Sequence, residues 1–224
     1  MRLTLKISLV LLITLKSIGS FGQEILVYGG LNYNSFYDHQ DKTPHFNSSY
    51  KPDLGFSAGI GLDSIRLDWI TFSFTLQLEK YGGEVKASAS GLGGGNSIDL
   101  ITDKWVISLG VFPLNFQLFK TIDISFGLEL SRLLHESNDG TISGWTIEPS
   151  NWSSNVEDYY SEYNRKSYIG LKGRIAYDFK LSKSIMISPQ YSYYFGLSNE
   201  FLELPKEAKS MRHYLCISIK KKIK

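Results

Sequence analysis

Eight charged residues take the positions expected to point inward in segments where apolar and polar residues alternate, and their types and spacing suggest chemistry more directly than any others in the chain. The acids are Glu79, Asp123, Glu129 and Asp178, and the bases are Lys172, Arg174, Arg212 and Lys220. Acids that face bases predict ion pairs, because a charge in a poorly hydrated interior is costly without its partner. We expect Glu129 to contact Lys172 or Arg174, since their segments are neighbours in a simple meander. The alternative is that each side chain meets water in a partly open channel.

No other group of residues has the spacing of a catalytic or metal site. The glycines at 91, 93, 94 and 95 are not followed by Gly-Lys-Ser/Thr, so they predict a flexible loop rather than a phosphate-binding loop. The four histidines form no HExxH pattern, and the one cysteine, Cys216, can form no disulfide framework within the chain. We therefore expect a protein that is not an enzyme, that binds no metal and that needs no cofactor.

Aromatic residues gather among acidic ones between His135 and Lys166. They are Trp145, Trp152, Tyr159, Tyr160 and Tyr163. Rings beside hydrogen-bond acceptors are what a sugar, a peptide or a protein partner would contact. Two interpretations stay open: a recognition loop, or a solvated loop whose aromatic side chains pack on one another.

The elements that position these residues are strands, because apolar and polar residues alternate with a period of two. The alternation is strict at 54–62, 70–78 and 122–130. Five further segments follow it less cleanly, at 25–37, 105–118, 169–179, 185–195 and 215–219. Successive side chains of a strand face opposite sides, so each segment has one apolar face and one face of small or polar residues. Pro113 predicts a bulge in the segment that contains it.

The links between these eight segments alternate in length. Short links are expected at 63–69, 119–121 and 180–183, and long polar links at 38–53, 82–103, 135–166 and 198–209. All the long links then fall at one end of a meander, which is typical of bacterial outer-membrane barrels. The sequence predicts an all-β protein, an eight-stranded antiparallel up-and-down transmembrane β-barrel.

The polar faces favour a membrane barrel over a soluble one. They are dominated by Gly, Ser and Thr, which suit the crowded interior of eight strands, whereas a water-facing strand is usually rich in Lys and Glu. Tyr33, Tyr37, Trp105, Tyr193 and Phe195 fall towards the long links, and Tyr177 and Phe179 towards the short ones. Two such aromatic bands are expected at the lipid interfaces. A soluble secreted β-barrel that binds a ligand is the competing interpretation.

The first 22 residues have the pattern of a secretory signal peptide. Arg2 and Lys6 precede an apolar run, and Ser20 and Gly22 are the small residues expected before a cut, which leaves residues 23–224 as the barrel domain. Removal of three basic residues changes the formal net charge from +2 to −1, which gives no reason to expect nucleic acid as a partner. We expect a protein of a Gram-negative outer membrane that contacts outer-membrane lipid and the barrel-assembly machinery.

Three stretches also carry a family resemblance. They are the Ser-Phe-Gly-Gln that ends the signal peptide, the segment VISLGVFPLNFQLF at 106–119, and the closing RHYLCISIKKKIK. In these the chain resembles the PorT-like outer-membrane β-barrels, over most of its mature length. The resemblance implies a small barrel whose roles include assistance in protein secretion. We expect a plugged lumen and a structural or surface-recognition role through the long links, to an extracellular ligand or protein. Passage of small solutes is the alternative.

Overall fold

The computed structural model describes residues 24–38, 45–67, 70–119, 121–147, 151–156, 164–202 and 207–223. The strands are β1 (Glu24–Tyr37), β2 (Phe46–Leu67), β3 (Ile70–Gly91), β4 (Gly94–Leu118), β5 (Ile122–Thr146), β6 (Trp152–Asn155), β7 (Ser167–Tyr177), β8 (Phe179–Lys180), β9 (Ile185–Gly196) and β10 (Lys209–Lys222). Within these ranges the chain forms no helix with the length and hydropathy that a membrane-spanning helix requires.

Eight of the strands close into a ring. The order is β10-β1-β2-β3-β4-β5-β7-β9, every neighbouring pair is antiparallel, and β9 pairs in turn with β10. β6 adds to β5, and the two-residue β8 adds to β9. The predicted eight-stranded antiparallel up-and-down barrel is confirmed.

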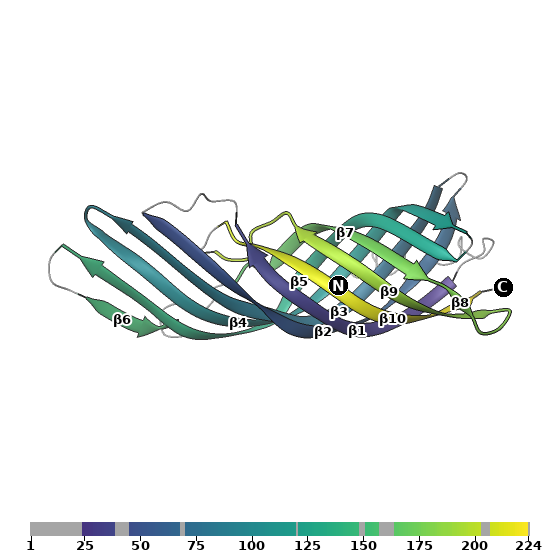
Figure 1. The fold of residues 1–224 in the computed structure, drawn as a ribbon, viewed down its shortest axis with the longest axis horizontal. Helices are drawn as coiled ribbons and strands as arrows, with labels where there is room; N and C mark the ends of the chain where they lie inside the picture. Colours follow the sequence, from purple (N-terminus) through teal and green to yellow (C-terminus); the bar gives the residue numbers. More distant parts are fainter. Residues whose placement is uncertain are drawn as a thin grey trace, which may run out of the picture.

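The strands differ in length, and this sets the shape of the molecule. β2 to β5 have 22 to 25 residues, whereas β1, β7, β9 and β10 have 11 to 14. β1 pairs with β2 only as far as Asn34↔Asp53, and β7 pairs with β5 only as far as Arg132↔Ser167. Beyond these rows the four long strands continue as an open sheet that projects from one end of the barrel (Figure 1). We call this sheet, with residues 46–52, 82–91, 94–103, 136–146 and β6, the extension.

The extension corrects three of the predicted long links. Residues 82–103 are a hairpin with its turn at Leu92 and Gly93, residues 135–146 continue β5, and β2 begins at Phe46 within the predicted 38–53 link. The predicted segments 54–62, 70–78, 105–118 and 122–130 are therefore too short for these four strands. At the other end, β2 runs to Leu67, so the predicted 63–69 link is also shorter than expected.

Apolar and polar residues alternate between the two faces of the strands as predicted. The predicted bulge at Pro113 is also present. The β4–β5 pairing shifts between Val111 and Leu114, which leaves Pro113 outside the ladder. On β7, Lys172 and Arg174 are buried while Leu171 and Ile175 are exposed. The inside of the barrel is polar and its outside is apolar, so the competing interpretation as a soluble barrel is wrong.

Candidate functional site

The outer face of the barrel forms an apolar belt. On β1, Ile25, Val27, Leu31 and Tyr33 are all at least 44% exposed, and the same kind of row follows Ile169 to Tyr177 on β7. Each row spans nine residues, which matches the ~9–11 residues that a tilted strand needs to cross a bilayer. An exposed apolar surface that surrounds the molecule at one height is a lipid-facing surface.

Aromatic side chains border this belt. Near the extension, the rings of Tyr37 and Phe195 stack 5.1 Å apart, and Phe56 meets Trp105 edge to face at 5.2 Å. At the opposite end the rings of Tyr177 and Phe179 lie 4.7 Å apart. Such rings favour the level of the lipid headgroups.

The middle of the lumen is built around Glu79. Its carboxylate accepts hydrogen bonds from the Arg212 guanidinium, from the Tyr214 hydroxyl at 2.7 Å and from Ser108 Oγ at 3.1 Å. Arg212 also lies against the face of the Tyr194 ring, 3.7 Å from its centroid. Glu79 and Arg212 are fully buried, so the pair is held away from water on all sides.

Glu129 lies beside this group and pairs with Lys172. Lys172 Nζ lies 2.5 Å from Glu129 Oε2 and 3.0 Å from Gln77 Oε1, and Arg212 is 3.8 Å from the other Glu129 oxygen. Arg174 contacts Asp63 and Ser125 instead of Glu129. Of the two partners considered for Glu129, the structure therefore brings Lys172 to it.

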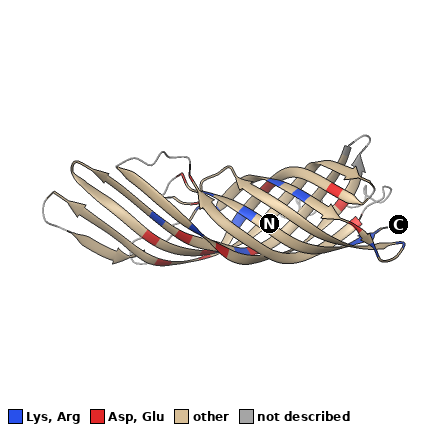
Figure 2. Cartoon of the chain, viewed as in Figure 1, with Lys and Arg blue, Asp and Glu red and all other residues tan. Residues whose placement is uncertain are grey.

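A second group fills the end of the lumen near the short turns. Lys220 Nζ lies 2.5 Å from Asp123, 3.0 Å from Asp178 and 3.5 Å from Asp63. Arg174 approaches the same Asp63 carboxylate at 3.2 Å. The eight charged residues considered from the sequence thus all face the lumen or its rim, and their ion pairs form two groups. Figure 2 marks acidic and basic positions along the strands of the barrel and of the extension.

A third group closes the mouth that faces the extension. Lys104 Nζ bonds Glu200 at 2.8 Å, and both side chains are at most 1% exposed. Four rings surround the ammonium at 4.4 to 5.9 Å, namely those of Phe36, Tyr81, Tyr168 and Phe201. Residues of the links that follow β5 and β9 complete an apolar cluster there, including Val156 and Ala208. The described residues of these links therefore cover the lumen at this mouth.

Sequence reasoning missed Asp63, Lys104 and Glu200. The sequence predicts Asp63 in the short link 63–69 and Glu200 in the long link 198–209, because each stands outside a strict alternation. Lys104 falls between the predicted 82–103 link and the predicted 105–118 segment, but it keeps the parity of Val106 and Ser108 on β4. This spacing of two residues from Val106 is the one signal in the sequence that predicts a Lys104 side chain pointing into the barrel.

One hollow inside the barrel is small. The hollow between Tyr28, Gln77, Lys172, Gln190 and Tyr214 has a volume of about 10 Å³, which is room for roughly one water molecule. Among the described residues, no group of three His, Cys, Asp or Glu side chains could hold a metal ion. The sole thiol, that of Cys216, is buried 3.6 Å from Ser57 Oγ.

The outer face of the extension carries ion pairs in place of the apolar belt. Glu84 pairs with Lys51 at 2.7 Å and with Lys86 at 3.1 Å, and Lys86 reaches Asp99 at 2.5 Å. Hydrogen bonds from Lys51 and Lys86 lower the pKa of Glu84, and those to Asp99 and Glu84 raise the pKa of Lys86. A charged, exposed surface of this kind belongs in water.

The extension also carries the two described members of the predicted aromatic set. Trp145 is 46% exposed and pairs with Gly95 on the outer face, whereas Trp152 lies over Gly144 on the face that continues the lumen. The structure therefore places these tryptophans on opposite faces of one sheet rather than in one loop. Tyr159, Tyr160 and Tyr163 lie outside the described residues.

A closed barrel that is apolar outside and polar inside leaves no backbone group unpaired in lipid, and bacterial barrels of this kind lie in the outer membrane. The chain is a β-barrel of a Gram-negative outer membrane.

Solved structures of similar architecture include Neisserial surface protein A, at 12% identity and a TM-score of 0.43 over 89% of this chain and 97% of that one. Ail of Yersinia pestis, solved with the heparin analogue sucrose octasulfate, has 11% identity, a TM-score of 0.38 and coverages of 89% and 99%. OprG of Pseudomonas aeruginosa has 10% identity, a TM-score of 0.34 and coverages of 92% and 98%. No protein-family model and no curated protein matches the sequence.

Proposed function

We propose that this protein is a plugged membrane anchor that holds a recognition surface, the extension, outside the cell. The observation that carries the proposal is the contrast between a lumen filled by paired charges and four strands that continue beyond the membrane belt. A filled lumen conducts nothing, so the barrel serves to hold what it carries.

The extension has features that suit recognition. Leu92 at its tip is 99% exposed, and Ile147 and Trp145 at its far edge are 75% and 46% exposed. A shallow polar hollow of about 370 Å³ crosses the sheet beside them, lined largely by hydroxyl and amide side chains such as Asn47, Ser88 and Thr141. Exposed apolar residues next to convergent polar groups are typical of protein and carbohydrate contacts. A role in protein secretion, as in PorT-like barrels, would use this same surface.

Passage of small solutes is the second candidate, and planar-bilayer recording separates it from the first. We expect the full mature chain to form no stable open channel, because Glu79, Arg212 and their neighbours close the lumen. Stable channels of porin size would overturn the plugged anchor. Neither candidate assigns the protein an enzymatic activity.

The recognition role is tested in intact cells with a photo-crosslinking residue at position 92. We expect light-dependent adducts of discrete mass that weaken in the Trp145→Ala variant, and no such adducts from position 181 in the opposite turn. Surface protease should cut the chain between 147 and 166 and spare the 180–183 turn. Equal cleavage at both places in sealed cells would reverse the orientation, and a lack of adducts at position 92 would remove the recognition role.

A further inference from the structure

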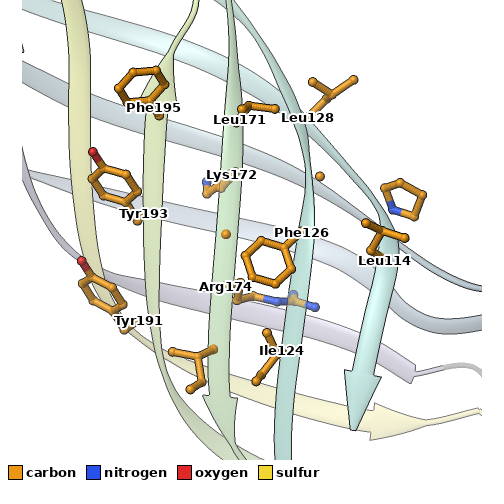
Figure 3. Close-up of a pocket in the computed structure, with 14 residues that line it drawn as sticks. Leu114, Ile124, Phe126, Leu128, Leu171, Lys172, Arg174, Tyr191, Tyr193 and Phe195 are labelled. Carbon is orange, nitrogen blue, oxygen red and sulfur yellow. The ribbon is translucent and has the colours of Figure 1, made fainter.

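Two hollows in the described surface of the molecule face different solvents. One has a volume of about 740 Å³ and an almost wholly apolar lining. Figure 3 shows Tyr191, Tyr193 and Phe195 of β9 along one side of it, and Ile124 and Phe126 of β5 along the other. It lies on the apolar belt, so lipid covers it as it covers the rest of the belt. The other, of about 370 Å³, crosses the outward face of the extension, where the solvent is water. We call this second hollow the polar hollow.

A row of hydroxyl and amide side chains lines the polar hollow. The row consists of register partners on β2, β3, β4 and β5, namely Asn47, Ser88, Ser97 and Ser143. Neighbouring strands are about 4.8 Å apart, so the row is roughly 14 Å long. Ser97 Oγ lies 2.7 Å from Ser143 Oγ. Two hydroxyls have two hydrogens and only one of these lies between the two oxygens, so the pair can donate the other to a ligand.

The charges in the lining of the polar hollow balance. The lining contains one base and one acid, Lys86 and Asp99, and their side chains are paired at 2.5 Å. Lys86 also contacts Glu84, which pairs in turn with Lys51. An anionic or a cationic ligand would meet no excess of the opposite charge here. This balance favours a neutral ligand that offers hydroxyl groups.

Trp145 lies against the sheet beside the row. It is two residues from Ser143 on the same face of β5, about 7 Å along the strand. Its indole nitrogen lies 2.7 Å from the position that a Cβ of Gly95 would take, so the ring extends across β4 instead of standing out from the sheet. The glycine leaves the space that the ring occupies. Because Trp145 is 46% exposed, one face of its ring is open to solvent.

This combination suits a sugar better than a protein. A sugar ring has a face of C–H groups, which packs on an aromatic ring, and a rim of hydroxyls that donate and accept hydrogen bonds. The centres of protein interfaces are instead apolar and aromatic, and serine is depleted there. On the extension an exposed indole lies next to a row of hydroxyl and amide groups whose neighbouring charges balance.

We propose that the outward face of the extension binds a neutral glycan. One sugar stacks on Trp145, and the next sugars lie in the polar hollow, along the row from Ser143 to Asn47. The hydroxyl and amide groups of the row orient these sugars by hydrogen bonds. The proposal rests on the recognition role of the extension and names the class of ligand that this surface takes.

Isothermal titration calorimetry with the full mature chain in detergent micelles tests the charge and the class of the ligand. The probes are linear hexasaccharides of glucose, mannose and galactose in α and β linkages. Hexamers of galacturonic acid and of glucosamine are the acidic and basic counterparts. We expect at least one neutral hexamer to bind, and both charged hexamers to bind at least about tenfold more weakly than it does.

Two variants test the placement of the glycan. Trp145→Ala should weaken binding of the neutral hexamer at least about tenfold, because the ring on which the sugar stacks is lost. Ser97→Ala/Ser143→Ala should weaken it severalfold, because hydrogen bonds to the sugar hydroxyls are lost.

Two control variants match these changes outside the site. Trp152→Ala removes an indole from the opposite face of the same sheet. Ser137→Ala/Ser154→Ala removes one hydroxyl from the outward face nearer the barrel and one from the inward face. Both should leave binding of the neutral hexamer within about twofold. Each variant is first shown to be folded by its altered gel migration before and after boiling.

The outcomes decide the proposal. Binding of none of the neutral hexamers, tighter binding of a charged hexamer, or equal effects of the test and control variants would overturn the glycan site. The crosslinked adducts at position 92 separate this result from the recognition role. Adducts that carry peptides instead of sugars, identified by mass spectrometry, would mean that recognition stands with a protein as the ligand. Binding of a neutral hexamer without any adducts in cells would keep the site and remove the recognition role.

Discussion

The barrel and the extension share the strands β2 to β5, but the apolar face of these strands is the outward one in the barrel and the inward one in the extension. On β3 the outward residues change from Phe74, Leu76 and Leu78 to Lys80, Glu84 and Lys86. The inward ones change in the opposite sense, from Thr75, Gln77 and Glu79 to Tyr81, Val85 and Ala87. The solvent explains the switch: lipid surrounds the first half of the strand and water the second. The position of the membrane boundary can thus be read from one strand.

A charged residue therefore contributes differently to the stability of the barrel and of the extension. In the lumen a charge has no access to water and depends on its partner, whereas on the extension water replaces a lost partner. Equal substitutions should therefore give unequal effects in the two regions.

The largest expected effect comes from Arg212→Met, which leaves Glu79 buried without its cation. We expect a loss of about 3–5 kcal/mol in the free energy of unfolding, measured by urea titration in lipid vesicles. Lys86→Met on the extension, where side chains are about half exposed, should not shift the midpoint. Addition of Glu79→Gln to Arg212→Met should recover part of the loss. An unshifted midpoint in Arg212→Met would mean that the lumen is hydrated.

Exchange of an exposed apolar residue for arginine compares the two outer faces. Phe126→Arg on the belt should cost about 2–4 kcal/mol in the same titration, because the arginine enters lipid near the bilayer middle. Ile101→Arg is the matched change on the extension, where Ile101 is 56% exposed and pairs with Glu84. It should have little effect. Similar costs at both sites would contradict the placement of the membrane boundary.

A double-mutant cycle measures the pair that couples two strands inside the barrel. Glu129→Gln and Lys172→Met should show a coupling of about 0.5–3 kcal/mol in unfolding free energy, because the two atoms lie 2.5 Å apart in a dry site. The cycle of Glu129→Gln with Arg174→Met should give less, since Arg174 binds Asp63. Equal couplings would mean that the two bases share Glu129.

The smallest effect is expected at the edge of the extension. In Gly144→Ala the new Cβ would lie 2.7 Å from the Trp152 indole, so β6 must shift away from β5. We expect faster amide exchange at residues 152–155 by mass spectrometry and no change in the unfolding midpoint. A lower midpoint would show that the extension and the barrel unfold as one unit.

The same inversion explains how much of the fold the sequence predicts. Segments with apolar residues outward, such as 122–130, are recognised because one face stays apolar throughout. Beyond Leu78 the apolar residues of β3 lie on the inward face, which continues the lumen, instead of on the outward face. A pattern that requires one continuous apolar face therefore ends at Leu78, and it predicts a loop for residues 82–103. Only pairing across strands, as between Val85 and Leu100, identifies the rest.

The candidate site was predictable to the same extent. The eight lumen charges follow from parity within the predicted segments or a few residues beyond their ends, and their positions facing the lumen or its rim follow with them. Asp63 does not, because it lies on β2 beyond the predicted 54–62 segment and beside a register shift. Glu200 does not, because its placement depends on how the link after β9 folds back over the barrel. The tryptophans were grouped by closeness in sequence, but strand pairing separates them to two faces.

The uninterrupted β3–β4 hairpin gives the molecule a mechanical property. These strands pair without a register shift from Ser73↔Phe112 inside the membrane to Gly91↔Gly94 at the tip. A pull on the tip along the strands therefore loads this ladder in shear, so that many hydrogen bonds bear the force together. Tension applied at the extension is carried along this hairpin into the ring of strands held by lipid, although the β2–β3 and β4–β5 pairings both shift register at the membrane boundary.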